Sequence, residues 1–138
     1  MAKKTKRSIQ WVIKKKNSII QKQQKFAGIH LIAEFWNGKT IDNSKKLKKV
    51  LIGAVKASKN TPLNIVIHKF SPQGITGVVL LAESHLAIHS WPELNYTAID
   101  IFTCGQKAMP QKALEYLKKV IKPKRVEIKE FKRGEFYE

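Results

Sequence analysis

The chain has 138 residues, of which 43% are hydrophobic, so it is long enough and apolar enough for one folded domain and is not a disordered chain. No apolar run approaches the ~20 residues that a transmembrane helix needs, and the basic start lacks the unbroken apolar segment of a secretory signal. The single cysteine, Cys104, excludes an internal disulfide. A cytoplasmic protein with no membrane contact is therefore expected.

The charge is strongly positive, with 27 lysines and arginines against 10 acidic residues and a net charge of +17. Such a charge attracts polyanions, but only three of these residues are arginine, whose planar guanidinium is best suited to phosphates and bases. Nine basic and no acidic residues fall within 1–25. The sequence predicts a basic extension over 1–25, in nonspecific contact with polyanions, and a folded domain over 26–138. A nucleic-acid-binding module is the alternative.

In the first half of the domain, the sequence predicts a strand, a helix and a second strand. Residues 26–36 form a strand candidate that ends at the turn-forming pair Asn37-Gly38. Residues 42–44 offer helix N-caps, and the apolar residues from Leu47 to Val55 then recur on one helical face opposite lysines. A second strand over 62–70 ends at the turn signal of residues 71–74.

The second half predicts strands over 75–84, 85–90 and 96–104, a helix that begins at Pro110 and stops before Pro123, and a last strand over 125–131. Two helices and about six strands, mostly joined as hairpins, are typical of an α+β fold. We therefore predict a two-layer α/β sandwich with a mostly antiparallel sheet and two main helices.

The stretch "ESHLAIHSWPE" (83–93) places two histidines on one face of a strand. Histidines four residues apart on a strand lie about 13 Å apart, too far for one zinc ion. No other His/Cys cluster has ligand spacing, so no metal site is predicted. Ser84 lacks the glycines of a hydrolase nucleophile elbow. A cysteine peptidase built on Cys104 and His89 stays open on composition, although a lone cysteine is more often structural.

Taken together, these residues match a known pattern. The segment "HKFSPQGITGVVLLAESHLAIHSWPELNYTAIDIFTCG" (68–105) closely resembles the prokaryotic S-adenosylmethionine decarboxylase family of pyruvoyl enzymes. The segments "GIHLIAEFW" (28–36) and "KALEYLKKVIKPKRVEIKEFKRG" (112–134) resemble the family's first strand and its closing helix and strand. The resemblance covers residues 26–134 and leaves the basic extension outside.

The resemblance implies that the chain is a zymogen that cuts itself. In this family the Ser84 hydroxyl attacks the carbonyl of Glu83, His89 acts as the acid/base group of processing, and Ser84 ends as a pyruvoyl group. The products are a β chain of residues 1–83 and an α chain of residues 84–138. Thr76 stands where the family often has a serine that supports processing.

The resemblance also implies the chemistry of the mature enzyme. The pyruvoyl at position 84 forms a Schiff base with the substrate and replaces pyridoxal phosphate as the electron sink. Cys104 matches the proton donor of the decarboxylation, and Phe70 matches an aromatic that stacks on the adenine of the substrate. No metal is implied. The family also implies a homodimer of αβ units.

The implied substrate is S-adenosylmethionine, and the implied product is the aminopropyl donor for spermidine. A pyruvoyl-dependent arginine or ornithine decarboxylase remains the alternative on the same core, since the motifs of self-cleavage are shared. Two departures bear on this choice. Gln106 and Lys107 stand where the family commonly places an acidic residue after Cys-Gly, and Ser90 stands where threonine is usual.

Overall fold

The computed structural model describes residues 24–104 and 107–137. The chain begins with strand β1 (Gln24–Trp36) and continues with helix α2 (Ser44–Ala57) and strands β2 (Pro62–Lys69), β3 (Ile75–Leu81) and β4 (Ser84–Trp91). A short 3-10 helix, η1 (Pro92–Leu94), leads into β5 (Tyr96–Cys104), α3 (Pro110–Ile121) and β6 (Arg125–Tyr137). In this part of the chain no helix is long and apolar enough to cross a membrane.

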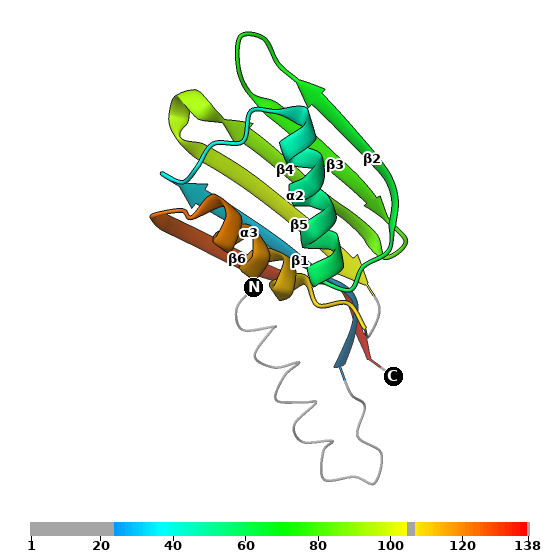
Figure 1. Ribbon diagram of the computed structural model, residues 1–138. Coiled ribbons are helices and arrows are strands. Elements are labelled where there is room, and N and C mark those ends of the chain that lie inside the picture. The colour runs from blue at the N-terminus through cyan, green and yellow to red at the C-terminus, as the bar shows by residue number, and fades with distance from the viewer. Residues whose placement is uncertain (1–23, 105–106, 138) are drawn as a thin grey trace, which may run out of the picture.

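The six strands form one sheet in the order β2-β3-β4-β5-β1-β6, and every neighbouring pair is antiparallel. Both helices lie on the same side of this sheet (Figure 1). The prediction of an α+β sandwich with an antiparallel sheet and two main helices is therefore confirmed.

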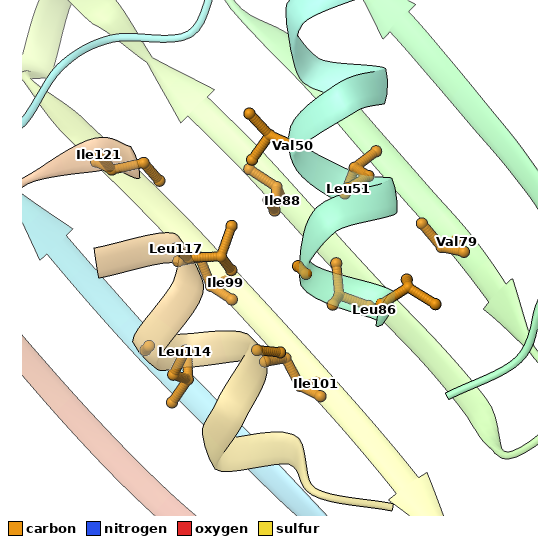
Figure 2. Close-up of a cluster of buried hydrophobic side chains, with 14 of the residues drawn as sticks. Val50, Leu51, Val79, Leu86, Ile88, Ile99, Ile101, Leu114, Leu117 and Ile121 are labelled. Atoms are coloured by element: carbon orange, nitrogen blue, oxygen red, sulfur yellow. The ribbon is translucent and has the colours of Figure 1, made fainter. Parts of the chain in front are cut away.

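The core lies between the helices and the covered face of the sheet. Apolar side chains of α2 and α3 point at the sheet from one face of each helix, as their spacing predicts. Figure 2 shows these side chains against those of the strands, and the labelled buried residues are Val50, Leu51, Val79, Leu86, Ile88, Ile99, Ile101, Leu114, Leu117 and Ile121. Asn43 caps α2 by accepting a hydrogen bond from the Lys46 N–H at 3.0 Å.

Three strands, β1, β4 and β6, are longer than predicted, whereas β3 ends at Leu81 and not at residue 84. Strand β1 starts at Gln24 and β6 runs on to Tyr137, because these two residues pair with each other across the sheet edge. The last two residues of the predicted extension therefore lie in the sheet. The division into an extension and a domain otherwise stays a prediction, since residues 1–23 lie outside the described part of the chain.

The other face of the sheet carries the polar residues of the central strands. Because neighbours in an antiparallel register point the same way, His85 of β4, Phe102 of β5 and His30 of β1 lie in one row across this face. No helix of the described residues covers it (Figure 1). We call it the open face, and it holds most of the candidate functional residues.

Candidate active site

The peptide bond between Glu83 and Ser84 lies in the turn that joins β3 to β4. The Ala82 N–H donates to the Thr61 carbonyl at 2.9 Å, and the Thr61 N–H donates to the Glu83 carboxylate at 2.5 Å. Ser84 has a φ of 153°, which L-residues rarely adopt. Such backbone conformations cost about 1–3 kcal/mol and gather at functional sites. The turn is thus anchored through the two residues that directly precede the strained Ser84.

Cys104, the last residue of β5, contacts the carbonyl group of Glu83. Its backbone N–H donates to the Glu83 carbonyl oxygen at 3.0 Å, and its thiol donates to the same oxygen at 2.9 Å. This contact follows from the register of the sheet, which pairs Ser84 with Thr103. Two donors on one carbonyl oxygen polarise the carbonyl and stabilise the negative charge that a nucleophilic attack would place there.

His85 contacts the hydroxyl group of Ser84. The Nδ1 atom of His85 lies 3.2 Å from Ser84 Oγ. The His85 ring meets the rings of His30 and Phe102 edge-on, with centroid distances of 6.2 Å and 5.8 Å. His30 in turn contacts the Asp100 carboxylate through its Nε2 atom. Hence a hydroxyl, two imidazoles and a carboxylate follow one another across β4, β1 and β5.

Ligand atoms of His30, His85 and Asp100 all lie within 4.8 Å of one another, so among the described residues these three could approach one metal ion. This grouping was not predicted, because the prediction compared the spacing of histidines only along one strand, whereas the three residues come from three strands. The direct contact between His30 and Asp100 gives the cluster an explanation without a metal. The prediction that no metal is bound stays a prediction.

His89 and Thr76 form a second group. They are paired across β3 and β4, and Thr76 Oγ1 lies 2.9 Å from His89 Nδ1. The threonine hydroxyl and the imidazole are thus in hydrogen-bond contact. However, His89 is five residues from Ser84 on an extended strand, which separates them by about 16 Å along β4. Within one chain, His89 and Ser84 cannot exchange a proton directly.

Phe70 belongs to this second group. Its ring is 48% exposed and meets His68 edge-on, with centroids 4.5 Å apart. Its N–H donates to the Gly74 carbonyl at 2.9 Å, and β3 begins at Ile75, opposite Ser90 of β4. Phe70 therefore lies at the end of the sheet opposite to the Glu83-Ser84 bond.

Asp42 holds the loop that presents Phe70. Its carboxylate accepts a hydrogen bond from the Gly74 N–H at 3.0 Å and pairs with the Lys69 ammonium at 2.9 Å. Lys69 also donates to the Phe70 carbonyl at 3.1 Å. The hydrogen bond from Lys69 is the main cause that lowers the pKa of Asp42 below its usual value, and the Gly74 N–H adds to it.

An aromatic row extends from His89 to the edge of the open face. Trp91 stacks on Tyr96 and Tyr96 stacks on Trp36, with centroid distances of 5.4 Å and 4.3 Å. The Tyr96 hydroxyl donates to Glu34. Burial, followed by this carboxylate, raises the pKa of Tyr96, so the phenol stays protonated.

A cavity of about 480 Å³ opens beside Cys104, within the size range of sites for small molecules. It is bounded by Gly28 of β1, by Pro110 at the start of α3 and by the rings of Phe26 and Phe136. A Cβ atom added at Gly28 would lie 2.7 Å from the Thr103 carbonyl oxygen, so a residue larger than glycine does not fit there. A cavity of mixed polarity, lined by two aromatic residues and by Lys25, thus adjoins Cys104.

The predicted site residues consequently fall into two groups. The first group, Glu83, Ser84, His85 and Cys104, surrounds the turn, whereas the second group, Phe70, Thr76 and His89, lies at the other end of the sheet. From the sequence, His85 was not assigned a role. Ser90 is buried on the covered face, so its difference from threonine concerns packing. Lys107 is exposed, and Gln106 lies outside the described residues.

The fold and the two groups of residues belong to a known class of protein, which the family match identifies. Residues 29–134 match the family described as S-adenosylmethionine decarboxylase, and the chain belongs to that family.

Individual relatives are similar over most of their length. The chain is 44% identical over 109 residues to the S-adenosylmethionine decarboxylase proenzyme of Methanococcus maripaludis, covering 78% of this chain and 89% of the relative. It is 44% identical over 116 residues to the proenzyme of the same name from Thermosipho melanesiensis, covering 83% and 89%. The crystal structure of the adenosylmethionine decarboxylase from Aquifex aeolicus superposes with a TM-score of 0.75 at 36% identity, covering 80% and 92%.

Proposed function

We propose that the chain is a proenzyme that cuts itself between Glu83 and Ser84 and then decarboxylates S-adenosylmethionine in the cytoplasm, providing the aminopropyl donor for spermidine. The observation that carries the proposal is the contact of Cys104 with the Glu83 carbonyl: its N–H and its thiol both donate to that oxygen. A carbonyl with two donors and an adjacent hydroxyl is arranged for an acyl transfer from nitrogen to oxygen.

The steps of self-cleavage balance on the residues of this turn. Ser84 Oγ bonds to the carbonyl carbon of Glu83, the bond from that carbon to the Ser84 nitrogen breaks, and an ester forms. Loss of the Ser84 α-proton then expels Glu83 as a carboxylate. Water replaces the nitrogen, which leaves as ammonia, and residue 84 ends as a pyruvoyl group. The anchored turn and the strained Ser84 favour this reaction, because cleavage releases the strain.

The residues around Ser84 fit a pyruvoyl group, because the Cα atom that becomes its ketone carbon belongs to a half-buried residue directly after the polarised carbonyl of Glu83. The group supplies an electrophilic ketone that draws electrons from the carboxylate-bearing carbon of an amino acid. Cys104 is the proton donor to that carbon. In the uncut chain its thiol is held by the Glu83 carbonyl, so cleavage frees the thiol together with the new terminus.

We further propose that the enzyme is a symmetric dimer in which the open faces of two copies meet. The first group of one copy is then completed by the second group of the other, which brings His89, Thr76 and Phe70 to Ser84. The separation of about 16 Å within one chain supports this arrangement. So do exposed apolar side chains on the open face and its rim, namely Val66, Phe70, Val78, Leu80, Trp91 and Phe131.

The substrate is tested by offering the purified, matured protein S-adenosylmethionine, arginine and ornithine in parallel and measuring carbon dioxide release. Release from S-adenosylmethionine alone is expected, because the cavity beside Cys104 has aromatic walls and Phe70 is exposed for stacking on adenine. Release from arginine or ornithine instead would assign the alternative substrate. A matured protein that decarboxylates none of the three would refute the proposal.

A further inference from the structure

We infer that His85, and not only His89, is a catalytic residue of self-cleavage: it accepts the proton of the Ser84 hydroxyl as that oxygen attacks Glu83. The inference rests on the proposed function and deepens it. Its basis is the distance of 3.2 Å between His85 Nδ1 and Ser84 Oγ. His89, the histidine that the resemblance assigns to processing, is held by Thr76 about 16 Å further along β4, so within one chain His85 alone reaches the Ser84 hydroxyl.

The first step then balances within the turn. The proton of Ser84 Oγ moves to His85 Nδ1, Oγ bonds to the Glu83 carbonyl carbon, and the carbonyl electrons move to its oxygen. That oxygen already accepts hydrogen bonds from the N–H and the thiol of Cys104. When the bond to the Ser84 nitrogen breaks, the protonated His85 returns its proton to that nitrogen. Base and oxyanion donors thus contact two adjacent groups of the same turn.

The surroundings of His85 suit a group that becomes positively charged in this step. Its ring is half-buried, and a ring nitrogen lies within 4.8 Å of ligand atoms of both His30 and Asp100. The Asp100 carboxylate contacts His30, and its oxygen also lies within 4.8 Å of a ring nitrogen of His85, so a carboxylate stands close to the imidazole that receives the proton. Phe102 packs edge-on against the ring and restrains its orientation. A carboxylate at this distance stabilises an imidazolium.

The experiment follows self-cleavage of newly synthesised full-length protein in a cell-free translation reaction, by the decay of the 138-residue chain on denaturing gels. His85→Asn should slow the decay at least about 100-fold, the lower range for loss of a general base. The control, Lys118→Asn, changes an exposed residue of α3, on the other side of the sheet from His85 (Figure 1). It should decay at the wild-type rate.

A second variant separates proton transfer from folding. His85→Ala should be equally slow, and added imidazole should accelerate it, because a free base can occupy the space of the missing ring. A His85→Asn protein that cleaves at the wild-type rate would overturn the inference while the proposed function stands. So would a slow His85→Ala protein, folded by circular dichroism, that does not respond to imidazole. If the wild-type chain is never cut before Ser84, the proposed function itself fails.

Discussion

Mixing two inactive variants tests whether the active site is shared between copies. Ser84→Ala lacks the nucleophile, and His89→Ala lacks the acid/base group of the second group. Proton transfer needs donor and acceptor within about 3 Å, whereas one chain separates the two positions by about 16 Å along β4. If a second copy supplies His89, random pairing of equal amounts places about half of the His89→Ala chains beside a Ser84→Ala partner whose His89 is intact.

We therefore expect each variant alone to remain uncut and about half of the His89→Ala chains to be cut after co-expression. Different affinity tags on the two variants allow the fragments to be assigned by mass spectrometry under denaturing conditions. In the matched control, Ser84→Ala is co-expressed with itself under both tags, and no fragment should form. The reasoning is refuted if the mixture stays uncut although the two variants co-purify, or if His89→Ala alone is cut like the wild type.

Three further outcomes are expected. Cys104→Ala should still be cut at least partly but lose about 10²–10⁴-fold in decarboxylation, measured as carbon dioxide release from matured protein, and unchanged turnover would assign the proton donor elsewhere. Asp42→Asn should raise KM for S-adenosylmethionine through the Phe70 loop. Because the pKa of Asp42 is lowered in the folded state, its stabilising effect should be present at neutral pH and lost as the pH falls below about 4, so the thermal midpoints of the two proteins should converge in acid. Deleting residues 2–23, which removes eight positive charges, should preserve self-cleavage and reduce retention on RNA at low salt; a truncated chain that is never cut would show that the segment is needed for the fold.

Local signals carried most of the fold. The cap at Asn43 and the apolar face from Leu47 to Val55 predicted α2 closely, because both depend on residues within four positions of each other. The lengths of β1 and β6 could not be predicted in the same way. Residues 132–137 are all exposed and half of them are charged, and they form a strand because β1 lies alongside and pairs with them. Pairing between distant segments leaves little trace in either sequence.

The same distinction applies to the candidate site, where the sequence identified residues but not their contacts. Alternation on the strand placed His85 and His89 on one face, and the resemblance pointed to Ser84 and Cys104. The contact of Cys104 with the Glu83 carbonyl depends on the register between β4 and β5, which alternation does not reveal. The same register places His85 near His30 and Asp100 and leaves His89 with Thr76. The sequence therefore listed the reactive groups but not which of them are neighbours.

The order of the strands has a consequence for the protein after it is cut. The fragment before Ser84 would contain β1, α2, β2 and β3, and the fragment from Ser84 onward would contain β4, β5, α3 and β6. In the order β2-β3-β4-β5-β1-β6, the first fragment's β1 is threaded between two strands of the second. Strands of the two fragments are thus neighbours at three places in the sheet. Separating the fragments would require breaking the pairings β3-β4, β5-β1 and β1-β6, together with the core beneath the sheet. We therefore expect the cleaved protein to remain one non-covalent complex, with its new terminus held where the peptide bond was broken.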